Sequence, residues 1–271
     1  MNLLSKIDGL GRITLSILFA LHAMVEGVFL SLYMFIWVEK KSSRAHFQEI
    51  LKQIYFTGVQ AIWPTLIIAT ALGIFSAFYS NSDLFSIGSD HTLAKILTQL
   101  SIEGLGPLVI SFLAIARSCT AIASELGTMK VNHEIDTLRV ICKDPYAFLV
   151  FPRIFGGCVA VVCLGILFTI SLITTFCFAL YFAEEVSLVS SFGSLTMHWN
   201  ISFILFLFAK YAIPAMAIFS VATQQGLSVK RSSHEVPIVT SKAVLQSFYV
   251  VFICHGAIGF LQYASVFGGP R

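Results

Sequence analysis

Charged residues are scarce in this sequence. Only 11% of its 271 residues are Asp, Glu, Lys or Arg, while 57% are hydrophobic and the mean hydropathy is +0.86. A soluble domain carries about 25% charged residues, so this composition excludes an ordinary soluble fold. Several apolar runs also reach the roughly 20 residues that a helix needs to cross a bilayer. The composition therefore predicts an all-α polytopic membrane protein.

The sequence also lacks the motifs of several enzyme classes. It has no G-x-x-x-x-G-K-[ST] loop, so ATP would have to be hydrolysed by another chain. It has no H-E-x-x-H motif, and its seven histidines are scattered without metal-ligand spacing. The six cysteines form no C-x-x-C pair, which is typical of small buried hydrophobic side chains. We expect no catalytic residue, no metal, no cofactor and no nucleic acid on this chain.

Five apolar runs predict a five-span bundle over residues 55–271. The spans cover about 55–79, 94–118, 154–182, 201–223 and 243–267. Pro64 is expected to kink the first span near its start, because proline removes a helical hydrogen bond and clashes with the preceding turn. Together with residues 1–54, which precede the bundle, these spans form a single membrane domain.

Residues 1–54 contain one more apolar run, at 13–38, with Lys or Arg on both flanks. Cytoplasmic segments are enriched in Lys and Arg, so basic flanks at both ends place both ends in the cytoplasm. The run is therefore predicted to be an interfacial or re-entrant elbow helix, and the alternative is a true first span. A signal peptide is disfavoured by the length of the run and the lack of a small-residue cleavage site.

The distribution of basic residues predicts the orientation of the bundle. If the elbow stays inside, fourteen of the seventeen Lys and Arg residues fall in cytoplasmic segments. The exceptions are Lys95, Lys210 and Arg271. This asymmetry is the expected positive-inside bias. It places the interval 124–153 in the cytoplasm, two short loops outside and the C-terminus outside.

The interval 124–153 is polar but not linker-like. Asn132 is predicted to cap a short helix, because its side-chain oxygen can accept a backbone N–H of the first turn. Apolar residues recur along one face of this helix and charged residues occupy the other face; the former are Ile135, Leu138 and Ile141, and the latter are Glu134, Asp136 and Arg139. The Asp144-Pro145 pair should end it. Such a helix suits either a partner surface or the lipid headgroups, and these residues leave both readings open.

Two ionisable residues fall within predicted spans. Glu103 and Lys210 each lie nine residues after the outer end of their span, which is about 13 Å along a helix. Charges inside a membrane are costly and usually have a partner or a function. The two are predicted to pair; the alternatives are a lipid headgroup, or water and backbone carbonyls if the spans are not adjacent. With His198 they form no nucleophile–base arrangement, which disfavours an intramembrane enzyme.

One ordered series of motifs resembles the MlaE/YrbE permease family. The series runs through Leu105-Gly106-Pro107, Arg117, Glu125-Leu126-Gly127-x-Met129, Glu134-Ile135-Asp136, Leu138, Asp144-Pro145 and Pro152-Arg153. Members are membrane subunits of ABC systems that move lipids together with MCE-domain proteins. The resemblance implies a homodimer in the bacterial inner membrane, cytosolic ATPase subunits that carry ATP and Mg, and a periplasmic MCE-domain partner.

In the family, the interval between the second and third spans is a coupling helix that docks on the ATPase. The resemblance therefore implies a cytoplasmic coupling surface made of Glu125, Gly127, Met129, Glu134, Asp136, Leu138, Arg139, Asp144 and Pro145. The chain departs from the family pattern at two places. Glu103-Gly104 stands where an Arg-Glu pair is frequent, and residues 235–241 replace a glycine-rich segment, with less backbone freedom.

The substrate is predicted from aromatic content and from the resemblance. Twenty-five phenylalanines suit a greasy cavity, although lipid-facing packing is the ordinary explanation. The lipid pocket of the family involves the first, second and last spans, so we expect lipid contacts at Ile74, Phe78, Leu105 and Val109. The function expected is that of an ABC permease subunit, which moves phospholipid between the inner membrane and the MCE-domain partner. The alternatives are an intramembrane lipid-modifying enzyme and a structural membrane subunit.

Overall fold

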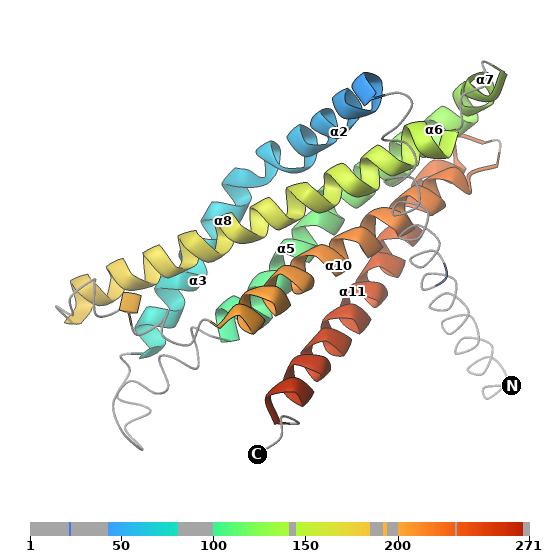
Figure 1. The fold of residues 1–271 in the computed structure, drawn as a ribbon. Helices are drawn as coiled ribbons and strands as arrows, with labels where there is room; N and C mark the ends of the chain where they lie inside the picture. The colour runs from blue at the N-terminus through green and yellow to red at the C-terminus, as the bar shows by residue number, and fades with distance from the viewer. Residues whose placement is uncertain are drawn as a thin grey trace, which may run out of the picture.

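Long helices lying side by side form the described part of the chain (Figure 1). The computed structural model describes residues 22, 43–80, 100–140, 145–184, 192–193, 200–230 and 232–267. The elements are α2 (Ser43–Thr57), η1 (Val59–Ala61), α3 (Ile62–Ser80), η3 (Ser101–Leu105), α5 (Gly106–Ala114), η4 (Ile115–Cys119), α6 (Thr120–Val131), α7 (Glu134–Val140), η5 (Tyr146–Val150), α8 (Phe151–Glu184), α10 (Ile201–Leu227) and α11 (Glu235–Phe267). The predicted elbow run at 13–38 lies outside the described residues except for His22.

Five of these helical stretches are long and apolar enough to cross a membrane. They are Phe47–Phe78, Ser101–Val131, Phe148–Phe182, Ile201–Leu227 and Glu235–Ala264. A helix satisfies its backbone hydrogen bonds internally, which is what a segment inside lipid requires. The predicted all-α polytopic class with five spans is confirmed.

The first span begins earlier than predicted. Its helix starts at Ser43, so the last residues of the region that we assigned to the elbow belong to α2 instead. The chain bends at η1, a short 3-10 turn, where the Ala61 N–H donates to the Gly58 carbonyl at 3.0 Å. Pro64 stands in the first turn of α3, just after this bend. The predicted kink is present, and it lies on the N-terminal side of the proline because Pro64 cannot donate to the carbonyl of Gln60.

The second and last spans are longer than their apolar runs. The second helix continues through α6 to Val131 and contains two π-helical segments, η3 and η4. The last helix begins at Glu235, within the segment that the sequence analysis treated as a polar connection. Pro237 fits there because the first N–H groups of a helix have no intrahelical acceptor.

Helix α8 is central to the bundle and contacts α2, α3 and α10, while α10 also contacts α6 and α11. Glycines permit close contact at these crossings, as small residues commonly do between membrane helices. A Cβ atom at Gly165 would lie 2.5 Å from the Tyr211 ring, and one at Gly157 would lie 2.5 Å from Phe219. These two glycines therefore set the distance between α8 and α10.

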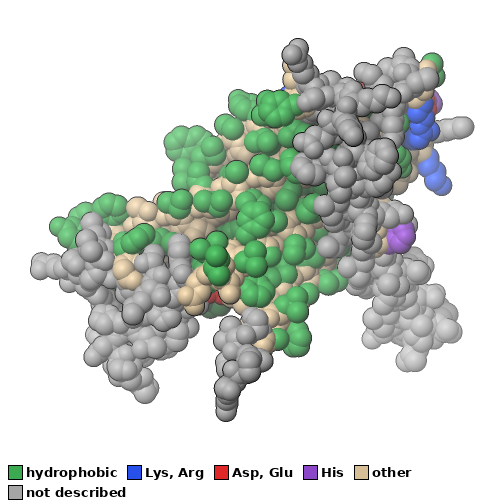
Figure 2. Space-filling view, in the orientation of Figure 1, with side chains coloured by type: hydrophobic (Ala, Val, Ile, Leu, Met, Phe, Trp, Pro, Cys, Tyr) green, Lys and Arg blue, Asp and Glu red, His purple; other side chains and the backbone are tan. Residues whose placement is uncertain are grey.

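Apolar side chains cover the visible length of the bundle, whereas Lys and Arg side chains gather at the end that carries α6 and α7 (Figure 2). The apolar surface includes Trp63, Ile67 and Phe260, each more than 60% exposed. A surface of this kind suits lipid or another apolar helix rather than water.

Candidate functional site

Helices α6 and α7 form a helical corner at the charged end of the bundle. Helix α6 ends at Val131, and the Asn132 N–H donates to the Thr128 carbonyl at 2.9 Å. His133 then turns the chain with a positive φ of 59°. The predicted cap by the Asn132 side-chain oxygen is wrong. Its amide nitrogen instead donates to the Glu134 carboxylate at 3.3 Å, because Asn132 still belongs to the end of α6.

The predicted two-sided character of α7 is present in the structure. Ile135 is 2% exposed, and Leu138 is half-buried against the core. Asp136 and Arg139 lie on the accessible side, where their side chains form an ion pair of 3.8 Å. His133 Nδ1 lies 3.1 Å from the Asp136 carboxylate, and this hydrogen bond holds the pKa of Asp136 below its ordinary value. One apolar face thus anchors α7 and leaves its charges available to a partner.

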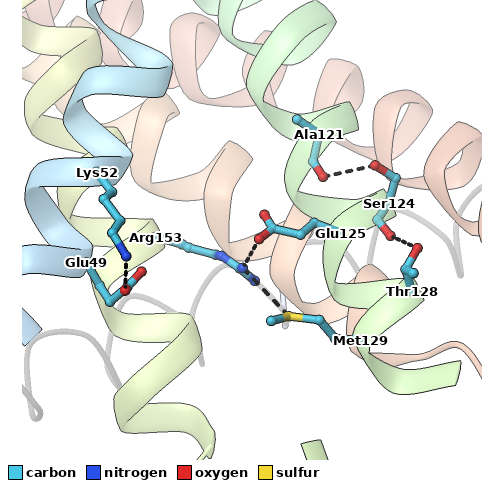
Figure 3. A network of polar contacts seen from close by, with 8 residues as sticks. All are labelled: Glu49, Lys52, Ala121, Ser124, Glu125, Thr128, Met129 and Arg153. Carbon is cyan, nitrogen blue, oxygen red and sulfur yellow. Dashed lines mark hydrogen bonds and ion pairs between the residues drawn. The ribbon is translucent and has the colours of Figure 1, made fainter. Parts of the chain in front are cut away.

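Glu125 and Met129 belong to α6 and face α8, rather than forming part of α7. The Arg153 guanidinium of α8 makes an ion pair of 2.9 Å with the Glu125 carboxylate, and it also approaches the Met129 sulfur at 3.9 Å (Figure 3). Arg153 is 9% exposed. A buried charge of this kind is costly unless it is paired, so Glu125 stabilises its position. These contacts join the second and third spans beside the helical corner.

A pocket of about 430 Å³ opens next to this ion pair. Its walls come from α2, α6, η5 and α8, and its lining residues are Glu49, Lys52, Gln53, Phe56, Glu125, Phe148, Leu149, Pro152 and Arg153. On the α2 side, the Lys52 ammonium and the Glu49 carboxylate form an ion pair of 2.8 Å. The pocket therefore has two acidic and two basic groups beside an apolar wall.

Gly127 is a packing position. A Cβ atom there would lie 3.2 Å from Val229, which precedes α11, and 3.3 Å from Val236, which is in the first turn of α11. Its lack of a side chain lets α6 approach the connection between α10 and α11. Among the other predicted coupling residues, Pro145 directly precedes η5, and Asp144 lies outside the described residues.

Lys210 contacts Glu103 between the second and fourth spans, in agreement with their matched depth, while pairing of their two side-chain charges stays a prediction. The Lys210 ammonium donates a hydrogen bond to the backbone carbonyl of Glu103, at 3.1 Å. The Glu103 carboxylate accepts a hydrogen bond from the Gln262 amide at 2.6 Å. The second, fourth and fifth spans are therefore joined by polar contacts at this level, and Gln262 is a participant that the sequence analysis did not consider.

Arg117 makes a second contact of this kind with a backbone carbonyl. Its guanidinium donates to the Gln60 carbonyl and, at 3.3 Å, to the Gln60 side-chain oxygen. Pro64 stands four residues after Gln60 and has no N–H to donate. Arg117 therefore supplies a donor to a carbonyl at the bend of the first span, and it fastens the second span to that bend.

The four predicted lipid contacts lie on neighbouring elements. Ile74 and Phe78 are one turn apart on α3 and are 43% and 70% exposed. Leu105 is 43% exposed, and Val109, one turn later, is partly buried against the core. Leu105 ends η3, Val109 lies in α5, and α5 contacts α3. Lipid binding there stays a prediction.

A family model described as "Permease MlaE" matches residues 50–261. This match covers all five of the candidate spans almost completely and includes the helical corner. The chain belongs to the MlaE permease family. The resemblance read from the sequence motifs is confirmed, and the family consists of permeases rather than enzymes.

Individual MlaE relatives are distant. The "Intermembrane phospholipid transport system permease protein MlaE" of Haemophilus influenzae is 26% identical over 131 residues, which are 48% of this chain and 50% of that protein. The chloroplastic "Protein TRIGALACTOSYLDIACYLGLYCEROL 1" of Arabidopsis thaliana is 29% identical over 117 residues, 43% of this chain and 33% of that protein. These two alignments thus span half or less of each relative.

A longer alignment links the chain to a "Probable ABC transporter permease protein" of Synechocystis, at 23% identity over 223 residues, 81% of this chain and 84% of that protein. The similarity to MlaE permeases therefore extends over most of the chain, and it includes the helical corner, Glu103 and Lys210 within the matched range.

Several polar partners in this MlaE permease were missed by sequence reasoning. Glu49 and Lys52 had been assigned to the elbow region, although their charges three residues apart favour a surface pair on a helix. Gln60 had a local signal, because it stands four residues before a proline. Nothing in the sequence around Gln262 predicts its contact, since a single amide in an apolar run does not indicate its partner.

Proposed function

We propose that this chain is the membrane permease subunit of an ABC transporter that moves phospholipid. The support is the family match over residues 50–261, together with the name of the Haemophilus relative, which is a phospholipid transport system permease. ATP and Mg would be bound by a separate ATPase, since the chain has no phosphate-binding loop.

In this proposal, two copies of the chain lie in the bacterial inner membrane with ATPase subunits on the cytosolic side and an MCE-domain protein on the periplasmic side. The observation that carries the proposal is α7. Ile135 buries the helix against the bundle while Asp136 and Arg139 stay accessible. Motion of a docked ATPase would be passed through this anchored helix to α6, and through Glu125 and Arg153 to α8.

The test is charge reversal on α7. The double variant Asp136→Lys/Arg139→Glu should remain in the membrane and lose its ATPase, because both exposed charges would repel their former partners. Copurification identified by mass spectrometry, and lipid-stimulated ATP hydrolysis by the purified complex, measure the effect. If the chain were a membrane enzyme or a structural subunit, even the complex with the unchanged chain would show no lipid-stimulated ATP hydrolysis.

The matched control is Glu49→Lys/Lys52→Glu, which reverses another exposed pair with the same spacing on α2. This control should retain the ATPase in copurification, and only copurification is compared, because Glu49 and Lys52 also line the pocket beside Arg153. If the α7 variant copurifies with the ATPase and hydrolyses ATP as well as the unchanged chain does, the coupling role of α7 is wrong.

A further inference from the structure

The pocket beside Arg153 contains a buried donor without an acceptor. Arg153 Nη1 is buried and has no hydrogen-bond partner among the described residues, although Nη2 of the same guanidinium contacts Glu125. Leaving such a donor unsatisfied is costly, and buried polar groups usually have a partner. Arg153 is also one of the residues that line the pocket, so its guanidinium can donate to a hydrogen-bond acceptor that enters there.

Taking the first residue of each candidate span as the membrane surface, we infer that the pocket lies at the depth of lipid headgroups. Lys52 and Arg153 each stand five residues after the first residue of their candidate span, Phe47–Phe78 and Phe148–Phe182. Five residues of helix extend about 8 Å. The headgroup region on each side of the hydrocarbon core is of similar thickness, roughly 5–8 Å. The charges on α2 and α8 are thus level with each other and with the polar part of one leaflet.

The charges in the pocket match a headgroup that carries both signs. Arg153 and Lys52 suit a phosphate, while Glu49 and Glu125 suit an ammonium group. A ligand with a phosphate alone would face two carboxylates. The Lys52–Glu49 ion pair is exposed, and exposed ion pairs contribute little to stability. A ligand can therefore separate these two side chains and bind each of them at small energetic cost.

The apolar wall of the pocket favours a lipid over a soluble phosphate. Phe56 is 60% exposed, and Phe148, Leu149 and Pro152 complete the apolar lining. The volume of about 430 Å³ is within the range of small-molecule sites, roughly 300–1,000 Å³. An acyl-glycerol group can lie on this wall while the headgroup meets the charges.

We propose that this pocket binds the headgroup of an aminophospholipid, of the phosphatidylethanolamine class, from the leaflet at the α7 end of the bundle. Its phosphate accepts hydrogen bonds from the Arg153 guanidinium and the Lys52 ammonium, and its own ammonium donates to Glu49 and Glu125. This site goes beyond the proposed transport function, because Ile74 and Phe78 lie toward the other end of the first span. Lipid binding at this pocket requires that the chain is inserted in a membrane, but it requires no partner protein.

The test is photo-cross-linking of the full chain in phosphatidylcholine nanodiscs that contain a minor fraction of phosphatidylethanolamine. A benzophenone amino acid at Phe56 should capture phosphatidylethanolamine with roughly tenfold enrichment over its share, the scale of one hydrogen bond to a charged group. The same probe at Trp63, which is 74% exposed on α3, should capture lipids in proportion to composition.

Arg153→Gln should remove the enrichment, and Lys242→Gln, which changes an exposed base on α11, should retain it. If Arg153→Gln fails to fold, Lys52→Gln and Glu49→Gln at the exposed rim should each reduce the enrichment. Loss of enrichment only in these pocket variants supports the site. Proportional capture at Phe56, or enrichment unchanged by the pocket variants, overturns it.

Two further arms exclude other occupants. Equal enrichment of phosphatidylglycerol, or displacement by inorganic phosphate, would indicate a simple anion site and overturn the proposal. Capture of a copurifying ATPase instead of lipid would assign the pocket to a protein partner and overturn it as well. Because lipid capture does not depend on ATP hydrolysis or on an intact α7 surface, the binding assay can fail while the α7 experiment succeeds, and the reverse also holds.

Discussion

The Lys210 ammonium donates a hydrogen bond of 3.1 Å to the backbone carbonyl of Glu103. Pro107 stands four residues after Glu103 and has no N–H, so the regular helical donor to this carbonyl is missing. Lys210 supplies a donor from a neighbouring span. Arg117 does the same for the Gln60 carbonyl before Pro64. In both places a basic side chain stabilises a helix where a proline interrupts the hydrogen-bond pattern.

Lys210→Met should lower the free energy of unfolding by about 1–3 kcal/mol, because it leaves a carbonyl in the membrane without this donor. Glu103→Gln keeps the backbone carbonyl and should cost less. The double variant Lys210→Met/Pro107→Ala should recover part of the loss, since alanine restores the N–H. Thermal denaturation in detergent micelles measures each change.

Lys242→Met, an exposed replacement on α11, is the control for loss of a lysine. Two results together would contradict this role of Lys210: equal losses of stability in Lys210→Met and Glu103→Gln, and recovered stability in Lys210→Met/Glu103→Gln. They would show that an ion pair between the two side chains is the dominant interaction.

Arg117→Gln should loosen the bend between α2 and α3. The variant removes the donor to the Gln60 carbonyl, and Pro64→Ala added to it should restore order by supplying an N–H. Spin labels at Leu51 and Ile67, both exposed, report the distance across the bend. The distribution of this distance should broaden in Arg117→Gln and narrow again in the double variant. Identical distributions in all three proteins would show that Arg117 does not hold the bend.

Gly165→Ala should destabilise the bundle by about 1–3 kcal/mol. Its Cβ atom would lie 2.5 Å from the Tyr211 ring, so α8 and α10 would have to separate. Gly256→Ala is the matched control, because no atom lies within 4 Å of its added Cβ and alanine favours helix. Melting temperatures of the purified variants make the comparison. Equal melting temperatures would mean that the α8–α10 distance adjusts without cost.

Asp136 should titrate below its ordinary pKa near 3.8, chiefly because of the hydrogen bond with His133. A carboxyl with a lowered folded-state pKa stabilises the corner fully above its unfolded pKa, and the contribution is lost as pH falls through the folded value. The carboxyl carbon resonance of labelled Asp136 gives the midpoint. His133→Ala should raise this midpoint, whereas Lys242→Gln should not. An unchanged midpoint in His133→Ala would contradict the assigned cause.

The apolar runs by themselves determined the class of this protein and its five spans. Burial of apolar side chains in lipid and internal pairing of backbone groups act on each segment separately, so composition is sufficient to predict them. The ordered motifs likewise determined the family. The helix ends were less predictable. Val131 ends α6 beyond the apolar run, because Gly127 packs against Val229 and extends the buried surface past the membrane segment.

Only the tertiary structure decided which polar groups meet. Matched depth predicted that Lys210 and Glu103 would be neighbours, but the rotation of the helices about their axes directs the ammonium to a carbonyl. Arg117 and Gln60 are 57 residues apart, and Arg153 meets Glu125 only because α8 returns past α6. A side-chain contact of this kind depends on how two helices pack, and that packing is a property of the whole bundle rather than of either segment.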